Sequence, residues 1–260
     1  MDLKLSGKRV LVTGGNSGLG AAMVRAFAAE RARVAINYLA HPEQTAQLAG
    51  QLRANGSEVL ALQADVAQAD AVGAMFQQLD AAWGGLDVLV NNAGIDGPRA
   101  MAWEADALAW NRVLQINLSG SFLCARAALK RMVAQRSGVI INTSSVHELI
   151  AWSGYSAYSA SKAGLSMLSK TLAQEAGAYG VRVLCIAPGA IRTPINADVW
   201  HDAAGQQDLI SKIALGRVGE PDDVAAMAVV LASDVAGYVT GTSVFIDGGM
   251  TDYPAFSHGG

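Results

Sequence analysis

The chain has 260 residues, of which 52% are hydrophobic and 16% are charged, and its formal net charge is −3. This composition can build a large core, and the scattered charges indicate no basic face for nucleic acid. The most apolar run, residues 225–232, is far too short to span a bilayer, so no membrane partner is expected. The N-terminus leads directly into a turn and a strand, which favours a cytoplasmic protein without a signal peptide.

An apolar run at residues 9–12 predicts a buried strand. A glycine-rich turn follows it, and then a helix with apolar residues at helical spacing over about residues 21–30. Gly14, Gly18 and Gly20 permit a tight turn that brings backbone close to a ligand. The free N–H groups of the following helix then suit a pyrophosphate. This context favours a nucleotide site, although the spacing is not G-x-G-x-x-G and a plain turn is the alternative.

The second predicted strand covers residues 33–37, and its end is where dinucleotide folds bind the adenosine ribose. An acid there would bind the 2′-hydroxyl and repel a 2′-phosphate, but this chain has the neutral Asn37. Neither Leu39 nor the glycine turn with Asn16 and Ser17 supplies a cation for a phosphate. The sequence therefore allows NAD or NADP, with a slight preference for NAD.

The rest of the chain alternates helices and strands. Helices are expected at about 42–55, 70–83, 103–134, 158–178 and 220–232, and strands at 59–64, 86–90, 139–143, 181–186 and 244–247. This alternation predicts one α/β domain over residues 1–260, with a seven-stranded, doubly wound parallel sheet covered by helices on both faces. The polar segment at about 190–215 is expected to be a substrate lid.

Several predicted strands end in small or polar residues, such as Thr13, Asn37, Asp65 and Asn91, as a crevice along one sheet edge requires. Asn91 could equally be a turn former. Asn117 lies inside a helical pattern, where an asparagine is unfavourable. It is either a tolerated polar residue or a local break that directs a polar group at a site.

Tyr158 and Lys162 are four residues apart, so a helix would place both side chains on one face. A nearby ammonium favours the phenolate, so we expect Lys162 to lower the pKa of Tyr158. Such a tyrosine can exchange a proton with an alcohol or a carbonyl near neutral pH. Ser145 ends an apolar strand and adds a hydroxyl at the same sheet edge. No cluster of His, Asp, Glu or Cys has ligand spacing, so no metal is expected.

Together these motifs resemble, in order and spacing, the short-chain dehydrogenase/reductase family, whose Rossmann fold would cover essentially the whole chain. They are Thr13-Gly14-x3-Gly18-Leu19-Gly20, Asn91-Asn92-Ala93-Gly94, Asn117, Ser145, Tyr158-x3-Lys162 and Pro188-Gly189. Within the family the chain is most similar to the bacterial glucose 1-dehydrogenases, through stretches 144–148, 189–197 and 247–256. It departs from them in having Leu39 in place of an arginine, and Ser156-Ala157 where they have a histidine.

The resemblance implies a role for each site residue. Tyr158 would be the general acid/base, Lys162 would lower its pKa and bind the nicotinamide ribose, Ser145 would polarise the substrate oxygen, and Asn117 would anchor a water. The residues implied to line NAD or NADP, besides Tyr158 and Lys162, are Gly14, Asn16, Ser17, Gly18, Leu19, Asn37, Asp65, Val66, Asn91, Ala93, Gly94, Pro188, Gly189, Ile191 and Thr193. The family also implies a homotetramer.

The substrate is expected to be a small molecule with a sugar or polyol hydroxyl, plausibly glucose. Polar side chains near the site could recognise hydroxyls, and a tryptophan could form a wall: Asp96, His147, Glu148, Asn196 and Trp152. A ketone or a carrier-bound 3-oxoacyl group is the alternative substrate, and a non-catalytic NAD(P)-binding protein is a third reading. The acids near the predicted pocket favour a small molecule over an acidic carrier protein.

Overall fold

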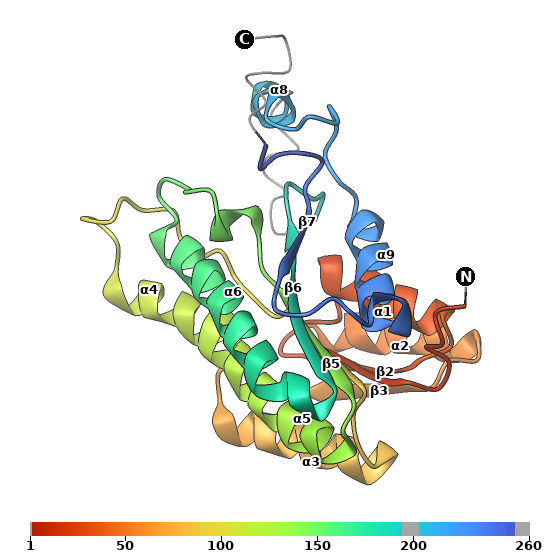
Figure 1. Cartoon of the computed structure of the whole chain (residues 1–260). Helices are drawn as coiled ribbons and strands as arrows, with labels where there is room; N and C mark the ends of the chain where they lie inside the picture. The colour runs from red at the N-terminus through yellow and green to blue at the C-terminus, as the bar shows by residue number, and fades with distance from the viewer. Residues whose placement is uncertain (1, 194–202, 253–260) are drawn as a thin grey trace.

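The computed structural model describes residues 2–193 and 203–252. Its centre is a sheet of seven parallel strands in the order β3-β2-β1-β4-β5-β6-β7 (Figure 1). The strands are β1 (Arg9–Val12), β2 (Arg33–Tyr38), β3 (Val59–Gln63), β4 (Val88–Asn91), β5 (Gly138–Thr143), β6 (Val181–Pro188) and β7 (Ser243–Ile246). The order reverses between β1 and β4, and a doubly wound sheet opens a ligand crevice at the carboxyl ends of such strands.

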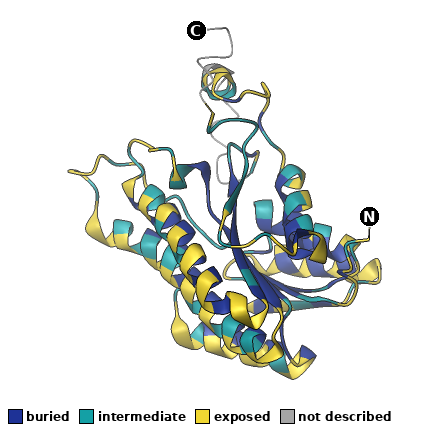
Figure 2. Ribbon diagram, viewed as in Figure 1, coloured by how far each residue is buried: buried dark blue, intermediate teal, exposed yellow. Residues whose placement is uncertain are grey.

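Helices cover both faces of the sheet because neighbouring residues of each buried strand point in opposite directions. Val10 and Val12 belong to one core and Leu11 to the other. The first core includes α1 (Gly18–Ala29), α2 (Pro42–Ala54) and α9 (Pro221–Ala232); the second includes α3 (Ala69–Trp83), α5 (Ser121–Gln135) and α6 (Ser156–Ala176). Figure 2 shows the two buried layers against the sheet. Among the described residues no helix is long and apolar enough to cross a membrane.

The helix expected at 103–134 is divided into three segments. Residues 103–106 precede α4 (Ala107–Leu114), because the Asp106 carboxylate caps its N-terminus by accepting from the Ala109 N–H at 2.8 Å. A π-helical turn, η1 (Gln115–Gly120), then joins α4 to α5. The local break expected at Asn117 is therefore present. Of the expected lid, the structure describes α8 (Ala203–Ser211), whereas residues 194–202 lie outside the described part.

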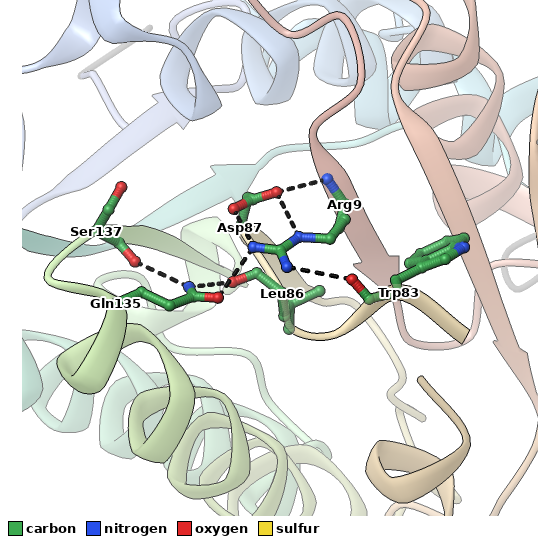
Figure 3. Close-up of polar contacts among 6 residues, drawn as sticks. All are labelled: Arg9, Trp83, Leu86, Asp87, Gln135 and Ser137. Atoms are coloured by element: carbon green, nitrogen blue, oxygen red, sulfur yellow. Dashed lines mark hydrogen bonds and ion pairs between the residues drawn. The ribbon is translucent and has the colours of Figure 1, made fainter. Parts of the chain in front are cut away.

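A polar cluster lies at the amino ends of β1 and β4, opposite the crevice at their carboxyl ends (Figure 3). The Asp87 carboxylate accepts from the Arg9 backbone N–H at 2.8 Å and from its guanidinium at 2.9 and 2.7 Å. The same guanidinium donates to Trp83 O and to Gln135 Oε1, and Gln135 donates to Leu86 O. Burial would raise the pKa of Asp87, but the hydrogen bonds and charge of Arg9 outweigh it and hold the pKa below its usual value. This cluster joins β1, α3, β4 and α5 far from the site.

Candidate active site

The turn between β1 and α1 forms a cradle of backbone atoms. Gly14 and Gly18 have φ angles of +59° and +48°, which side chains rarely tolerate. A Cβ at Gly20 would lie 2.1 Å from Gly14 O, so the first turn of α1 packs directly on the glycine turn. Ser17 precedes the helix without capping it through its side chain. The helix N–H groups are thus left for an anionic ligand, and the cradle fits the pyrophosphate of a nicotinamide dinucleotide.

Thr13 and Asn92 fix this cradle to the loop after β4. Thr13 Oγ1 accepts from the backbone N–H groups of Asn92 and Ala93 at 2.9 and 3.0 Å. Asn92 Nδ2 donates to Thr13 O and Gly14 O at 3.0 and 3.1 Å. The sequence placed Thr13 at a strand end but gave no sign of this cross-link. It sets the spacing of the two loops where the strand order reverses.

At the adenosine end, Asn37 differs from the role expected for it. Its side chain is 1% exposed, and its amide donates to Leu62 O and Ala64 O at 3.2 and 3.0 Å. Its oxygen faces the Gly14 N–H at 3.4 Å, so the amide holds the glycine turn against β3. Leu39, 54% exposed, is left at the surface after β2.

Other residues expected to line the cofactor lie along the same carboxyl edge. Asn16 Nδ2 donates to Ala40 O at 2.8 Å. Asp65 accepts from the Ala67 N–H and forms an ion pair with Arg112 at 3.1 Å. Beyond β6, Gly189 N–H donates to Ile246 O, and Ile191 is buried. The expected set also includes Val66, which follows β3, Pro188, which ends β6, and Thr193, which follows β6.

The π-helical turn brings Asn117 to the loop after β4 and to α6. Asn117 exchanges hydrogen bonds with the Ile95 backbone at 2.9 and 2.8 Å and donates to Ser161 Oγ at 3.1 Å. A Cβ added at Gly94 would lie 3.3 Å from Asn117 Oδ1 and 3.7 Å from Lys162 Nζ. Gly94, which is expected to line the cofactor, therefore lies next to Asn117 and Lys162, two of the residues expected to be catalytic.

Helix α6 carries Tyr158 and Lys162 on one face. Lys162 is 5% exposed, and its Nζ donates to Thr143 O at 2.7 Å, 5.4 Å from the centre of the Tyr158 ring. Burial lowers the pKa of Lys162 to about 8 and raises the pKa of Tyr158 to about 12. The expected lowering of the Tyr158 pKa is thus absent from this structure, because burial outweighs the hydrogen bond with Ser145, which acts in the lowering direction.

The two serines after β5 point in different directions. Ser145 lies beside Tyr158, and its hydroxyl also accepts from the His147 N–H at 3.1 Å. Ser144 is buried and donates to Lys162 O at 3.3 Å, behind the helix. The Ser145 hydroxyl therefore faces the Tyr158 side of the site, and the Ser144 hydroxyl faces away from it.

An aromatic column lies against Tyr158. Trp152 stacks between His147, with ring centres 4.4 Å apart, and Tyr155, at 3.9 Å. His147 and Trp152 both meet the Tyr158 ring edge-on, at 6.2 and 5.8 Å. The sequence singled out His147 and Trp152 as residues that could contact substrate, but not Tyr155. Its place in the column could not be seen from spacing alone.

Of the other residues expected to contact substrate, Asp96 is half-buried at the site, and burial raises its pKa against the charges of Lys162 and His147. Glu148 instead turns away from the column and accepts from Ser166 Oγ at 3.0 Å. Asn196 lies outside the described residues.

Comparison with known proteins places this geometry in a family. A family model described as enoyl-(acyl carrier protein) reductase matches residues 14–251. The chain is 46% identical over 259 residues to 3β-hydroxysteroid dehydrogenase 1 of Eggerthella lenta, with 98% of both chains covered. It is 38% identical over 252 residues to glucose 1-dehydrogenase 2 of Bacillus subtilis, covering 96% of this chain and 97% of that one. A crystal structure of a gluconate 5-dehydrogenase from Burkholderia cenocepacia, in complex with NADP and tartrate, superposes with a TM-score of 0.92 at 33% identity, covering 97% and 98%.

The chain belongs to the short-chain dehydrogenase/reductase family. It is an NAD(P)-binding oxidoreductase that acts on CH–OH groups.

Proposed function

We propose that the enzyme oxidises or forms a CH–OH group on a six-membered ring, using NAD in preference to NADP: it interconverts a secondary alcohol with its ketone, or a cyclic hemiacetal with its lactone. The observation that carries this proposal is the aromatic column of His147, Trp152 and Tyr155 beside Tyr158. Flat aromatic walls pack well against the CH groups of a saturated ring. The relatives named for a hydroxysteroid and for glucose both act on such rings.

In this proposal the side chains divide the proton chemistry among them, while the nicotinamide supplies the hydride acceptor or donor. Tyr158 takes the hydroxyl proton during oxidation, and Ser145 holds the substrate oxygen beside it. Lys162, as an ammonium on the same helix face, would stabilise the phenolate as it forms, against the rise in the Tyr158 pKa that burial causes. Asn117, held by the Ile95 backbone, keeps the π-helical turn that contains it in place beside Lys162.

A sugar such as glucose is the second candidate, supported by two hydrogen-bond acceptors near Tyr158. His147 Nδ1 lies 3.0 Å from Ile150 O, and a carbonyl only accepts, so the proton is on Nδ1. Burial lowers the pKa of His147, which leaves Nε2 as a neutral acceptor. With the Asp96 carboxylate it could accept from a second substrate hydroxyl, which a sugar has and a simple cyclic alcohol lacks.

A carrier-bound 3-oxoacyl substrate has less support. Docking of an acidic carrier needs cations around the entrance, whereas Lys130, Arg131 and Arg136 lie toward the C-terminal end of α5. That end leads into the start of β5, at the edge of the sheet opposite the crevice. Arg131 is paired with Asp80 there, and Arg136 donates to Ala178 O.

The preference for NAD follows from the surface after β2. Leu39 offers no charge to a 2′-phosphate. His41 lies 3.4 Å from Glu43, whose carboxylate would also disfavour a phosphate nearby.

The test is a comparison of initial rates with NAD and with NADP for a 3β-hydroxysteroid, D-glucose and cyclohexanol. We expect turnover of at least one ring alcohol, faster with NAD. Tyr158→Phe should reduce turnover by at least about 100-fold while NAD still binds. Turnover of only acyclic or carrier-bound substrates would refute the ring proposal, and a fully active Tyr158→Phe variant would refute the assignment of the general base.

We further propose that the chain forms a homotetramer. Helix α6 lies alongside α4 and α5 (Figure 1), and each of the three helices exposes a large apolar residue: Leu108 on α4, Phe122 on α5 and Met167 on α6. An exposed apolar surface of this kind is typical of protein interfaces. Light scattering after size exclusion should give about four times the monomer mass. A Phe122→Glu/Met167→Glu variant should give a smaller species, and a monomeric native protein at micromolar concentration would refute the proposal.

A further inference from the structure

Glu148 ends the short helix η2 (Val146–Glu148), and its carboxylate lies behind the site. Oε1 accepts from Ser166 Oγ at 3.0 Å, and Ser166 Oγ in turn lies 3.3 Å from Ser243 Oγ of β7. The second oxygen, Oε2, is buried and has no hydrogen-bond partner among the described residues. A buried carboxylate oxygen without a partner is costly, so a charge nearby must compensate it.

The compensating charge is the ammonium of Lys162, on helix α6, which also carries Ser166. Lys162 and Ser166 are four residues apart on the buried face of α6, one turn from each other. Three titratable side chains from other elements raise the pKa of Lys162 against the effect of burial: Asp96 after β4 most strongly, then Cys185 on β6 and Glu148 on η2. Tyr158 meets Lys162 from α6 itself. The Cys185 thiol is neutral, since burial raises its pKa to about 11, so the two carboxylates are the counter-charges.

We propose that Glu148 is a positioning residue that keeps Lys162 charged, through a carboxylate tethered to Ser166 one helical turn away. The inference rests on the proposed roles of Tyr158 and Lys162. Without an anion, burial favours the neutral amine, and a neutral amine cannot stabilise the phenolate. The tether also joins the loop that carries Ser145 to the helix that carries Tyr158.

Glu148 is better placed for this task than Asp96. Asp96 acts on both partners, because it raises the pKa of Tyr158 as well as that of Lys162. Glu148 raises the pKa of Lys162 and is absent from the groups that act on Tyr158. It therefore favours the ammonium without opposing the phenolate.

The experiment is the pH dependence of kcat/KM, from about pH 6 to about pH 10, with the ring alcohol that the wild type oxidises fastest. In Glu148→Gln, which keeps the shape and removes the charge, the pH at which activity is lost on the basic side should fall by about one unit. Glu175→Gln removes the same charge from the exposed side of α6 and should leave the profile unchanged.

Ser166→Ala keeps the carboxylate but removes its tether, and it should shift the basic limb in the same direction by a smaller amount. This variant removes only one hydroxyl, so if Glu148→Gln does not fold, the pH profile of Ser166→Ala by itself tests the role of Glu148. A basic limb at the wild-type pH in every folded variant would overturn the proposal. The Tyr158→Phe variant tests the proposed function separately, because a fully active Tyr158→Phe enzyme would refute the acid/base assignment. If Tyr158→Phe is inactive but the pH profiles of Glu148→Gln and Ser166→Ala match the wild type, only the role of Glu148 is refuted.

Discussion

Replacing Gly20 by alanine tests whether the contact of α1 with the glycine turn holds the cofactor cradle together. The added Cβ would lie 2.1 Å from Gly14 O and 2.7 Å from Asn92 Nδ2. Ordinary contacts begin at 3.4 Å, so the turn has to move by more than about 1 Å. That movement would break the hydrogen bonds from Asn92 to Thr13 O and Gly14 O.

The magnitude follows from these contacts. Overpacking costs about 1–3 kcal/mol, and the two lost hydrogen bonds cost about 1 kcal/mol each. Alanine recovers about 1 kcal/mol through its higher helix propensity. The net loss in the free energy of unfolding is about 2–4 kcal/mol, which lowers the melting temperature by about 5–15 °C.

Gly50→Ala is the matched control, since Gly50 also lies inside a helix but has no atom within 4 Å of an added Cβ. It should raise stability by about 0.5–1 kcal/mol and leave NAD binding unchanged. Urea unfolding and titration with NAD measure both quantities. A Gly20→Ala variant with wild-type stability and wild-type NAD affinity would refute the close contact at the turn.

Three further changes test other parts of the structure. Asp87→Asn should lower the free energy of unfolding by about 2 kcal/mol at neutral pH. Because the pKa of Asp87 is lower in the folded protein, this difference between variant and wild type should hold above about pH 4 and disappear as the pH falls through the folded pKa. Unfolding curves measured at a series of acid pH values test this. Leu39→Arg should raise the ratio of kcat/KM for NADP over NAD by about tenfold, with Leu39→Gln as the uncharged control; an unchanged ratio would place the 2′-position elsewhere. Trp152→Ala should raise the KM for a ring alcohol by about tenfold, and Trp103→Ala, which alters an exposed residue, should not; equal effects would argue against the aromatic wall.

The sheet could be predicted because each buried strand is a short apolar run between turn-forming residues, as in Arg9–Val12 before the glycine turn. The fold then follows from the alternation of strands and helices, since parallel strands need crossovers. Helix boundaries were less certain. Asp106 delays the start of α4 by capping it, and a capping aspartate looks in sequence like any loop residue.

The proximity of Tyr158 and Lys162, the proposed catalytic pair, could be anticipated from spacing because both residues lie on one helix. The directions of individual side chains could not be predicted from the sequence. Asn37 and Glu148 occupy sequence positions where we expected contact with a ligand, but Asn37 points into the core toward Leu62 O and Glu148 points toward Ser166. These directions depend on partners 18 to 25 residues away along the chain, which no local pattern records.

The π-helical turn η1 makes the direction of the Asn117 side chain depend on a single inserted residue. A π-helical turn holds one residue more than an α-helical turn, and each residue rotates an α-helix by about 100°. Deleting Leu118 would let α4 and α5 merge into one regular helix, which costs the backbone little. Asn117 would then face about a quarter-turn away from Ile95 and Lys162. The number of residues between α4 and α5 thus sets the direction of a proposed catalytic side chain, and we expect this deletion to leave a folded protein with reduced activity.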